Sequence, residues 1–148
     1  MIMNSMKIFN SLVFTILFSL ISFHAFGVEF SISTENNFIS KLRPGQKVTA
    51  GYMSIIPSDD ATIIKIEGKM IGRVEAHSMI MDGEIMKMRK ILPELLKNKK
   101  YQFKPGGNHL MLFDVERDLK KGDDVDFLFT FQLKNKKVIS KSIQFKVN

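Results

Sequence analysis

Apolar and polar residues alternate with a period of two along most of the chain after residue 27. This period is typical of half-buried β-strands, and the alternating runs are rich in the β-branched and aromatic residues that favour strands. The pattern predicts strands over residues 28–33, 48–56, 61–67, 72–81, 84–91, 100–104, 109–115, 124–133 and 137–147. Only residues 90–98 have a composition that favours a helical turn, and Pro93 limits its length.

Turn signals separate these predicted strands at short intervals. They are Arg43-Pro44-Gly45, Ser58-Asp59-Asp60, Asp82-Gly83, Pro105-Gly106-Gly107, Lys121-Gly122-Asp123 and Lys134-Asn135-Lys136. Many short antiparallel strands in one domain of about 120 residues are typical of sandwiches and small barrels. We therefore expect an all-β fold, a Greek-key β-sandwich, with a single domain over residues 28–148.

The first 27 residues have the pattern of an export signal. Lys7 supplies a positive start, residues 8–23 are almost wholly apolar, and Ala25 and Gly27 are the small residues that a signal peptidase requires. The alternative is an uncleaved membrane anchor, but the apolar stretch contains four Ser or Thr residues and is short for a span of about 20 residues. We expect cleavage before Val28, a periplasmic protein, and no stable membrane insertion afterwards.

Charge and cysteine content narrow the functional classes. Lys7 is the only charged residue of the first 27, so the rest of the chain keeps a net charge of +6, one less than the +7 of the whole chain. Its basic residues are scattered, which favours a solvated basic surface over a nucleic-acid site. The chain contains no cysteine, so it has neither disulfides nor the thiolate that a blue copper centre requires.

Methionines gather around the Asp82-Gly83 pair, which is a strong hairpin signal. A type I′ turn at these two residues places Met81 opposite Glu84, Met79 opposite Met86 and His77 opposite Met88. Because side chains alternate along a strand, the last two pairs share one face of the ribbon. Met is also a common core filler, so the hairpin by itself favours packing over metal binding.

A second stretch of the sequence, around His109, favours metal binding over packing. His109 and Met111 are two residues apart on a predicted strand and therefore project from the same face. His77 and His109 are the two histidines that follow the signal, and each has methionines at strand-compatible spacing. Thioethers are soft neutral donors that suit Cu(I), and imidazole binds copper in both oxidation states. These residues predict a Cu(I) site whose affinity weakens as the imidazoles take up protons, below about pH 6.5.

With these residues in view, the chain resembles the periplasmic copper chaperones of the PCu(A)C type. The signature of that family is a His, ten residues, a Met, about twenty-one residues and a His-X-Met. Here His77 is followed by residues 78–87 and Met88, and residues 89–108 separate Met88 from His109-Leu110-Met111. The stretches AGYMSI, DGEIMKMR, PGGNHLML and LKKGDDVDFLFTF resemble other characteristic segments of the family.

The resemblance implies a cupredoxin-like sandwich that carries Cu(I) and delivers it to the dinuclear CuA centre of a respiratory cytochrome oxidase. The ligands that it implies are His77, Met88, His109 and Met111. Cu(I) would be transferred by ligand exchange to a copper-accepting protein, such as a cytochrome oxidase subunit. We expect the carrier to be a monomer. Four other methionines would then be packing residues around the site or transient donors: Met53, Met79, Met81 and Met86. Asn108 would be a partner of an adjacent loop or ligand, or a plain turn residue.

Two other functional classes are alternatives to a copper carrier. A metal-free exported β-sandwich that binds protein or envelope components would use the methionines as core or contact surface. A copper enzyme with a histidine brace would need His at the mature N-terminus, where Val28 is expected, and no Ser-His-Asp set can be assembled. The sequence therefore favours a carrier and not an enzyme.

Overall fold

The computed structural model describes residues 29–148, and the predicted export signal lies outside these residues. The described part is built from strands, which are β1 Ile32–Ile39, β2 Thr49–Pro57, β3 Ala61–Gly68, β4 Ile71–Asp82, β5 Ile85–Ile91, β6 Glu94–Leu95, β7 Tyr101–Phe103, β8 His109–Val115, β9 Asp124–Leu133 and β10 Val138–Val147. Over these 120 residues no helix is long and apolar enough to cross a membrane. The predicted all-β class is confirmed.

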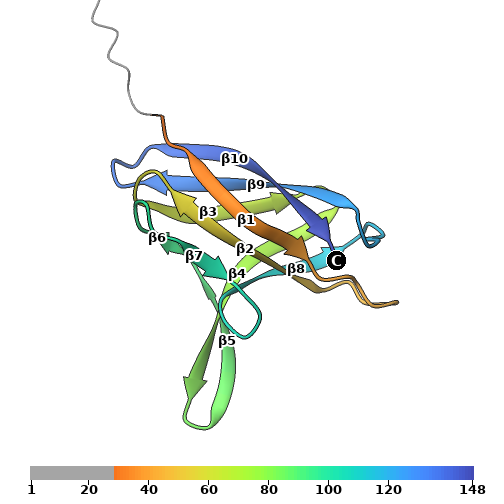
Figure 1. Cartoon of the computed structure of the whole chain (residues 1–148). Coiled ribbons are helices and arrows are strands. Elements are labelled where there is room, and N and C mark those ends of the chain that lie inside the picture. Colours follow the sequence, from red (N-terminus) through yellow and green to blue (C-terminus); the bar gives the residue numbers. More distant parts are fainter. Residues whose placement is uncertain (1–28) are drawn as a thin grey trace, which may run out of the picture.

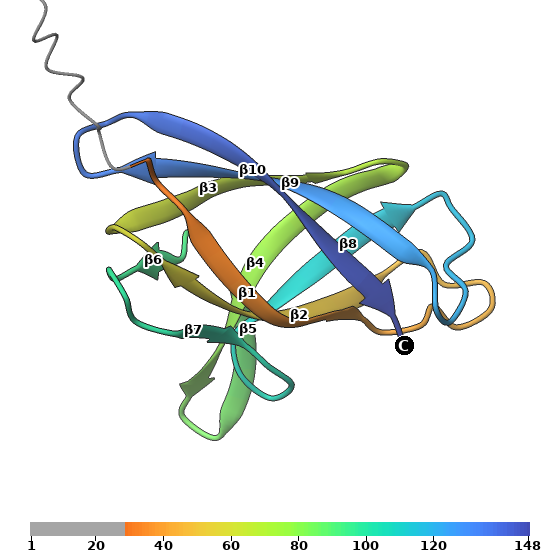
Figure 2. The same ribbon diagram turned by 45° about the horizontal axis from the view of Figure 1, so that its top comes forward.

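The strands form one continuous sheet in the order β5-β4-β8-β2-β1-β10-β9-β3-β6, and β7 also pairs with β2. Figures 1 and 2 show one layer of β3, β9 and β10 lying across from a second layer of β2, β4 and β8. β1 leads from one layer to the other. The two layers meet where β1 pairs antiparallel with β2 and, at its end, parallel with β10. The sheet is thus folded into a sandwich.

A bulge in β1 makes this passage between layers possible. Its register against β2 shifts between Glu35 and Phe38, and Asn36 has a positive φ of 55°. Asn is one of the few residues that adopt this conformation readily, and a bulge bends its strand. The Asn37 side chain donates hydrogen bonds to Thr34 Oγ1 (2.9 Å) and to the Gln144 carbonyl of β10 (3.2 Å). The bulge therefore ties β1 to the second layer.

The core lies between the layers and follows the period of two. Phe127, Phe129 and Phe131 alternate with polar or exposed residues along β9 and are at most 1% exposed. Phe129 stacks on Phe145 of β10 with ring centroids 6.2 Å apart. Met53 is also buried here, which agrees with packing, one of the two roles that the sequence left open for it, and not with a transient donor.

Two local predictions were wrong. The first strand does not span residues 28–33 but runs from Ile32 to Ile39, and residues 29–31 are not part of it. It continues past residue 33 because the bulge accommodates Asn36 and Asn37, which disfavour regular strands. Residues 90–98 contain no helical turn: β5 runs to Ile91, and β6 pairs with Ala61 and Thr62 of β3. Leu95 is buried by this pairing, and tertiary packing overrides its local preference.

Candidate metal centre

The two histidines lie side by side on neighbouring strands. His77 of β4 is directly opposite His109 of β8, and their ring centroids are 6.0 Å apart. The His77 side chain is 14% exposed, and His109 is 8% exposed. Val74, Ala76, Leu110 and Leu112 on the same strands point into the core, so the histidines occupy the outer face of this layer. The alternation of residues places His109 and Met111 on one face of their strand, and the pairing of β4 with β8 adds His77 to that face.

Each histidine has one ring nitrogen held by an acceptor. His77 Nε2 is 2.9 Å from Glu75 Oε2, and His109 Nδ1 is 3.0 Å from the Gly107 carbonyl. In the neutral rings these acceptors assign the proton to His77 Nε2 and to His109 Nδ1. The lone pairs are left on His77 Nδ1 and His109 Nε2. His77 Nδ1 is buried and has no hydrogen-bond partner within residues 29–148.

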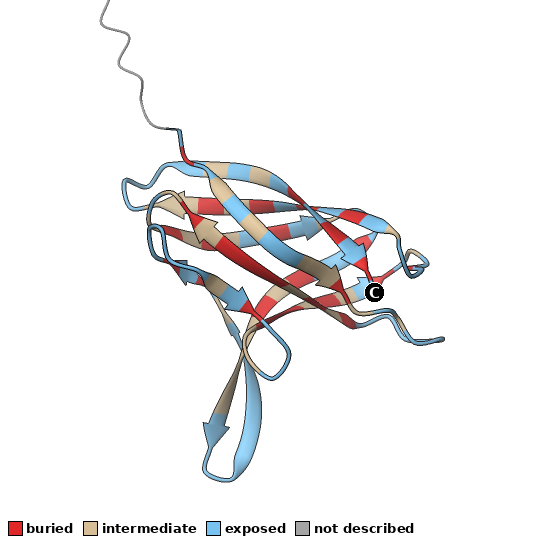
Figure 3. Ribbon diagram, in the orientation of Figure 1, coloured by how far each residue is buried: buried red, intermediate tan, exposed pale blue. Residues whose placement is uncertain are grey.

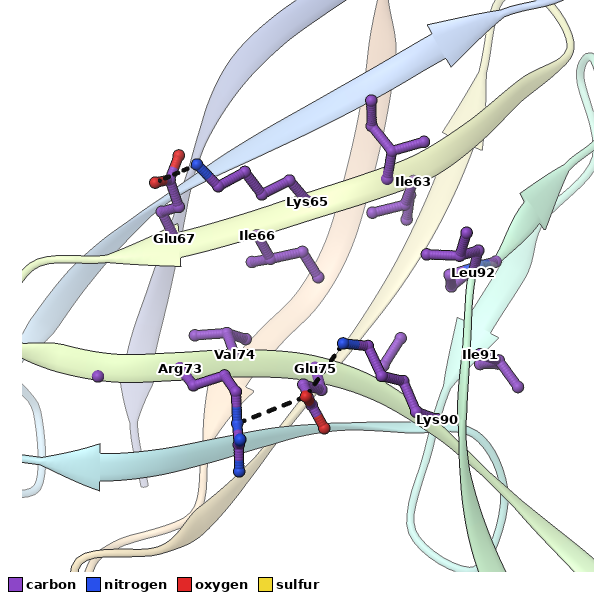
Figure 4. Close-up of a pocket in the computed structure, with 14 residues that line it drawn as sticks. Ile63, Lys65, Ile66, Glu67, Arg73, Val74, Glu75, Lys90, Ile91 and Leu92 are labelled. Carbon is purple, nitrogen blue, oxygen red and sulfur yellow. Dashed lines mark hydrogen bonds and ion pairs between the residues drawn. The ribbon is translucent and has the colours of Figure 1, made fainter.

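Glu75 connects His77 to two cations. Its Oε1 accepts a hydrogen bond from Lys90 Nζ (3.1 Å) and forms an ion pair with Arg73 Nε (3.4 Å). Figure 4 shows the three side chains converging at the pocket between β3 and β4. The hydrogen bond from His77, followed by the two cations, lowers the pKa of Glu75 although burial opposes this. Arg73 also lies 4.4 Å from the centre of the Phe113 ring. Glu75 is therefore an ionised and well-anchored acceptor for His77.

Glu75 was not singled out from the sequence. It stands two residues before His77 on a predicted strand, and this spacing places both side chains on one face. The Glu-X-His pattern was the signal that could have found it. Asn108, expected to be a partner of an adjacent loop or ligand or a plain turn residue, donates to the Tyr101 hydroxyl at 2.7 Å and fastens the 104–108 loop to β7. Burial raises the pKa of Tyr101, and this hydrogen bond acts in the opposite direction.

Met111 lies next to the histidine pair. It is opposite Glu75 on β4 and two residues beyond His109, so it shares their outer face, and it is half-buried. Thus His77, His109 and Met111 are brought together on two adjacent strands.

Met88 lies further out than predicted, because the register of the β4–β5 hairpin differs from the expected one by two residues. His77 faces Lys90, Met79 faces Met88 and Met81 faces Met86. The turn residues are Gly83 and Glu84, and of these only Gly83 has positive φ, at 65°. A positive φ at the first central residue alone is typical of a type II′ turn, whereas the predicted type I′ turn needs it at both.

The shift of two residues preserves the face of every side chain. Met88 therefore remains on the same face as His77 and is its diagonal neighbour. The Cα atoms of diagonal neighbours are about 7–8 Å apart, a distance that long side chains can span. It is 57% exposed. No group of three His, Cys, Asp or Glu side chains that could hold a metal occurs within residues 29–148. A metal bound at this face would depend on the thioethers as well as the imidazoles.

A family model and a curated relative each match a large part of the chain. The model of the LpqE-like family, whose description is of a lipoprotein, matches residues 32–143. The uncharacterized protein RP573 of Rickettsia prowazekii (strain Madrid E) is 32% identical over 96 residues, which are 62% of this chain and 53% of that protein. The chain thus spans about half the length of this curated relative.

Solved structures with the same fold are PCuAC domains and a related copper protein. The apo PCuAC domain from PmoF1 has a TM-score of 0.61 at 15% identity, covering 79% of this chain and 92% of that one. The copper-bound PCuAC domain from PmoF2 has a TM-score of 0.59 at 14% identity, covering 79% and 93%. The CuI-DR1885 protein of Deinococcus radiodurans has a TM-score of 0.53 at 18% identity, covering 88% and 85%. The cupredoxin-like sandwich expected from the resemblance is confirmed as the fold.

Proposed function

The chain belongs to the LpqE-like family, and from this premise we propose that it is an exported carrier of Cu(I) and not an enzyme. The observation that carries the proposal is the pair of histidine rings 6.0 Å apart, each with one nitrogen held by an acceptor. Metal-binding histidines almost always donate their other N–H in this way, to a carboxylate or a backbone carbonyl. His77 Nδ1, which is buried and has no partner among residues 29–148, is the atom that a metal would satisfy.

The proposed ligands are His77, Met88, His109 and Met111. Two neutral imidazoles and two thioethers form a soft donor set that suits Cu(I), whereas zinc and iron normally take thiolate, carboxylate or additional imidazole. The copper-bound PCuAC domain and CuI-DR1885 support this choice of metal, since their fold is that of this chain. Copper would be cargo, held by neutral donors and released as the ligands of a partner replace them one at a time.

Competition for Cu(I) against a chromogenic chelator tests the carrier role. The purified protein is expected to remove at least one equivalent of Cu(I) from the chelator. Loss of one outer partner of a metal ligand costs about 10–100-fold in affinity, so the double variant His77→Ala/His109→Ala is expected to lose more than that. Gln144→Ala, on β10 in the opposite layer, is the control. A wild-type protein that takes no Cu(I) from the chelator would exclude the carrier and favour the metal-free binding module.

We propose the periplasm as the location and the CuA centre of a respiratory cytochrome oxidase as the recipient. Export is supported by the signal-like residues 1–27 and by the lipoprotein description of the family, and the recipient by the resemblance to PCu(A)C chaperones. A deletion strain grown under copper limitation tests the recipient. Oxidase activity is expected to fall and to recover when copper is added. Unchanged oxidase activity in that strain would point to a different acceptor without affecting the Cu(I) site.

A further inference from the structure

The β4–β5 hairpin projects from the sandwich as an arm. Residues 79–88 form this arm, and Figures 1 and 3 show it extending away from the two layers, with β5 exposed along most of its length. β5 is the edge strand of the sheet and pairs with β4 alone. Its residues from Ile85 to Lys90 are all exposed. The arm is therefore solvated on both faces near its tip.

One face of the arm consists of methionines. Directly opposed residues share a face, and the register opposes Met81 to Met86 and Met79 to Met88. Met81 is 62% exposed, Met86 58% and Met88 57%. Two charged residues of the arm, Asp82 and Lys87, pair with each other on the opposite face at 2.5 Å, and the third, Glu84, lies in the turn. Between the turn and His77 this face carries thioethers and no oxygen or nitrogen ligand.

Core packing does not account for these residues. The sequence alone favoured packing for Met79, Met81 and Met86, yet Met81 and Met86 are among the most exposed large apolar side chains of residues 29–148. Large apolar side chains gathered in one exposed place usually mark a binding site. The same face continues along β4 to His77 and across to His109. The methionine face of the arm therefore leads directly to the proposed Cu(I) site.

We propose that Met79, Met81 and Met86 form a second Cu(I) site, made of thioethers only, on the arm. Directly opposed Cβ atoms are about 4.5–5.5 Å apart, and the next pair along the ribbon is about 7 Å away. Flexible and exposed Met side chains from adjacent positions can therefore turn their sulfur atoms toward one ion. Soft neutral sulfur selects Cu(I) over Ca²⁺, Mg²⁺ and Zn²⁺. This site deepens the proposed function and rests on Cu(I) being the cargo.

Met88 links the two sites. It lies opposite Met79 on the arm and is the diagonal neighbour of His77. An ion held by Met79, Met81 and Met86 would reach the histidines by exchanging one thioether at a time through Met88, with no change in oxidation state. The arm is thus the place where Cu(I) enters or leaves the inner site, and its exposure makes it accessible to a partner protein.

Titration of the purified protein with Ag(I), a redox-inert ion with the soft character of Cu(I), tests the second site. The methionine methyl resonances are followed by NMR alongside the calorimetric stoichiometry. We expect two ions per chain, the second shifting the methyl signals of Met79, Met81 and Met86. The triple variant with leucine at these three positions should bind one ion at unchanged affinity for the inner site. Met70→Leu, an exposed methionine outside the arm, is the matched control and should bind two.

The outcomes separate this inference from the proposed function. A wild-type protein that binds one ion, lost in His77→Ala/His109→Ala, keeps the inner site and overturns the arm site. A triple leucine variant that still binds two ions also overturns the arm site. One ion that survives in the histidine double variant and disappears in the triple leucine variant supports the arm site and overturns the histidine site. No binding in the wild-type protein overturns both.

Discussion

At the scale of single residues, the chemistry of the site depends on which nitrogen of each imidazole is free. The acceptors are Glu75 for His77 and the Gly107 carbonyl for His109. Gly107 belongs to the turn that follows Lys104, whose carbonyl accepts a hydrogen bond from the Gly107 N–H at 3.0 Å. One histidine is thus oriented by a side chain and the other by the backbone. Only the acceptor of His77, the Glu75 carboxylate, can be removed by a substitution that leaves the backbone intact.

Removing the Glu75 carboxylate is expected to weaken Cu(I) binding by about 10–100-fold, because His77 loses the acceptor that fixes its tautomer and ring orientation. Glu75→Ala should show the full loss in chelator competition, and Glu75→Gln should recover part of it, since the amide oxygen still accepts from Nε2. Glu67→Ala is the control, because Glu67 forms a similar ion pair with Lys65 (2.7 Å) and has no histidine partner. Equal affinities of Glu75→Ala and Glu67→Ala would refute this role.

The sequence predicts the ligand candidates better than the residues that orient them. Histidines and methionines are few enough for their spacing to be informative, whereas Glu75 is one of fifteen acidic residues. Its importance depends on burial, since its side chain is 13% exposed and bonded to three partners. Burial on the outer face of a sheet is created by neighbouring strands. The alternation of apolar and polar residues along one strand therefore does not predict it.

At the scale of elements, the hairpin shows how a turn controls the contacts of distant residues. The sequence pattern predicts both strands and the shared face, but the turn type decides which residues are opposite. Asp82-Gly83 allows a type I′ turn, while the structure uses Gly83-Glu84, which requires positive φ only at Gly83. Both turns keep the alternation of apolar and polar faces, so the pattern cannot choose between them. The consequence is that Met88 lies opposite Met79 on the arm instead of opposite His77.

Asp60 holds three elements together at the other end of the sandwich. It follows β2, its Oδ1 accepts from the Lys97 N–H at 2.7 Å, and its Oδ2 pairs with Lys134 of the β9–β10 turn. The hydrogen bond with Lys134, followed by that from Lys97, lowers the pKa of Asp60 below its ordinary value of 3.8. The same pair raises the pKa of Lys134 above 10.5.

Asp60→Asn is expected to lower the free energy of unfolding at neutral pH and to have little effect in acid. A depressed pKa in the folded state means that the stabilisation is fully present above the unfolded value, near 3.8, and is lost as the pH falls through the folded pKa. Urea unfolding at pH 7 and near pH 2 measures the difference. Asp118→Asn is the control, because the Asp118–Lys120 pair is 3.6 Å long and largely exposed. A stability difference that persists unchanged in acid would contradict this explanation.

At the scale of the whole molecule, the class of fold was predictable and the path of the sheet was not. Alternation identifies the strands of the core, as with Phe127, Phe129 and Phe131 on β9. It contains no information on partners far apart in the chain, such as the parallel pairing of Phe38 and Ile39 with Lys146 and Val147. That pairing closes the sandwich and depends on a bulge at Asn36, where the local propensity opposes a strand.

The exposed methionines of the arm also set the chemical conditions in which the protein can work. An oxidant converts a thioether to a sulfoxide, which is polar and no longer a soft donor. Met81, Met86 and Met88 face solvent and would be reached first, while Met53 is buried in the core and protected. Oxidation would therefore remove the soft donors of the proposed arm site before it disturbed the fold, and a reductase that restores methionine would recover those donors without refolding the protein.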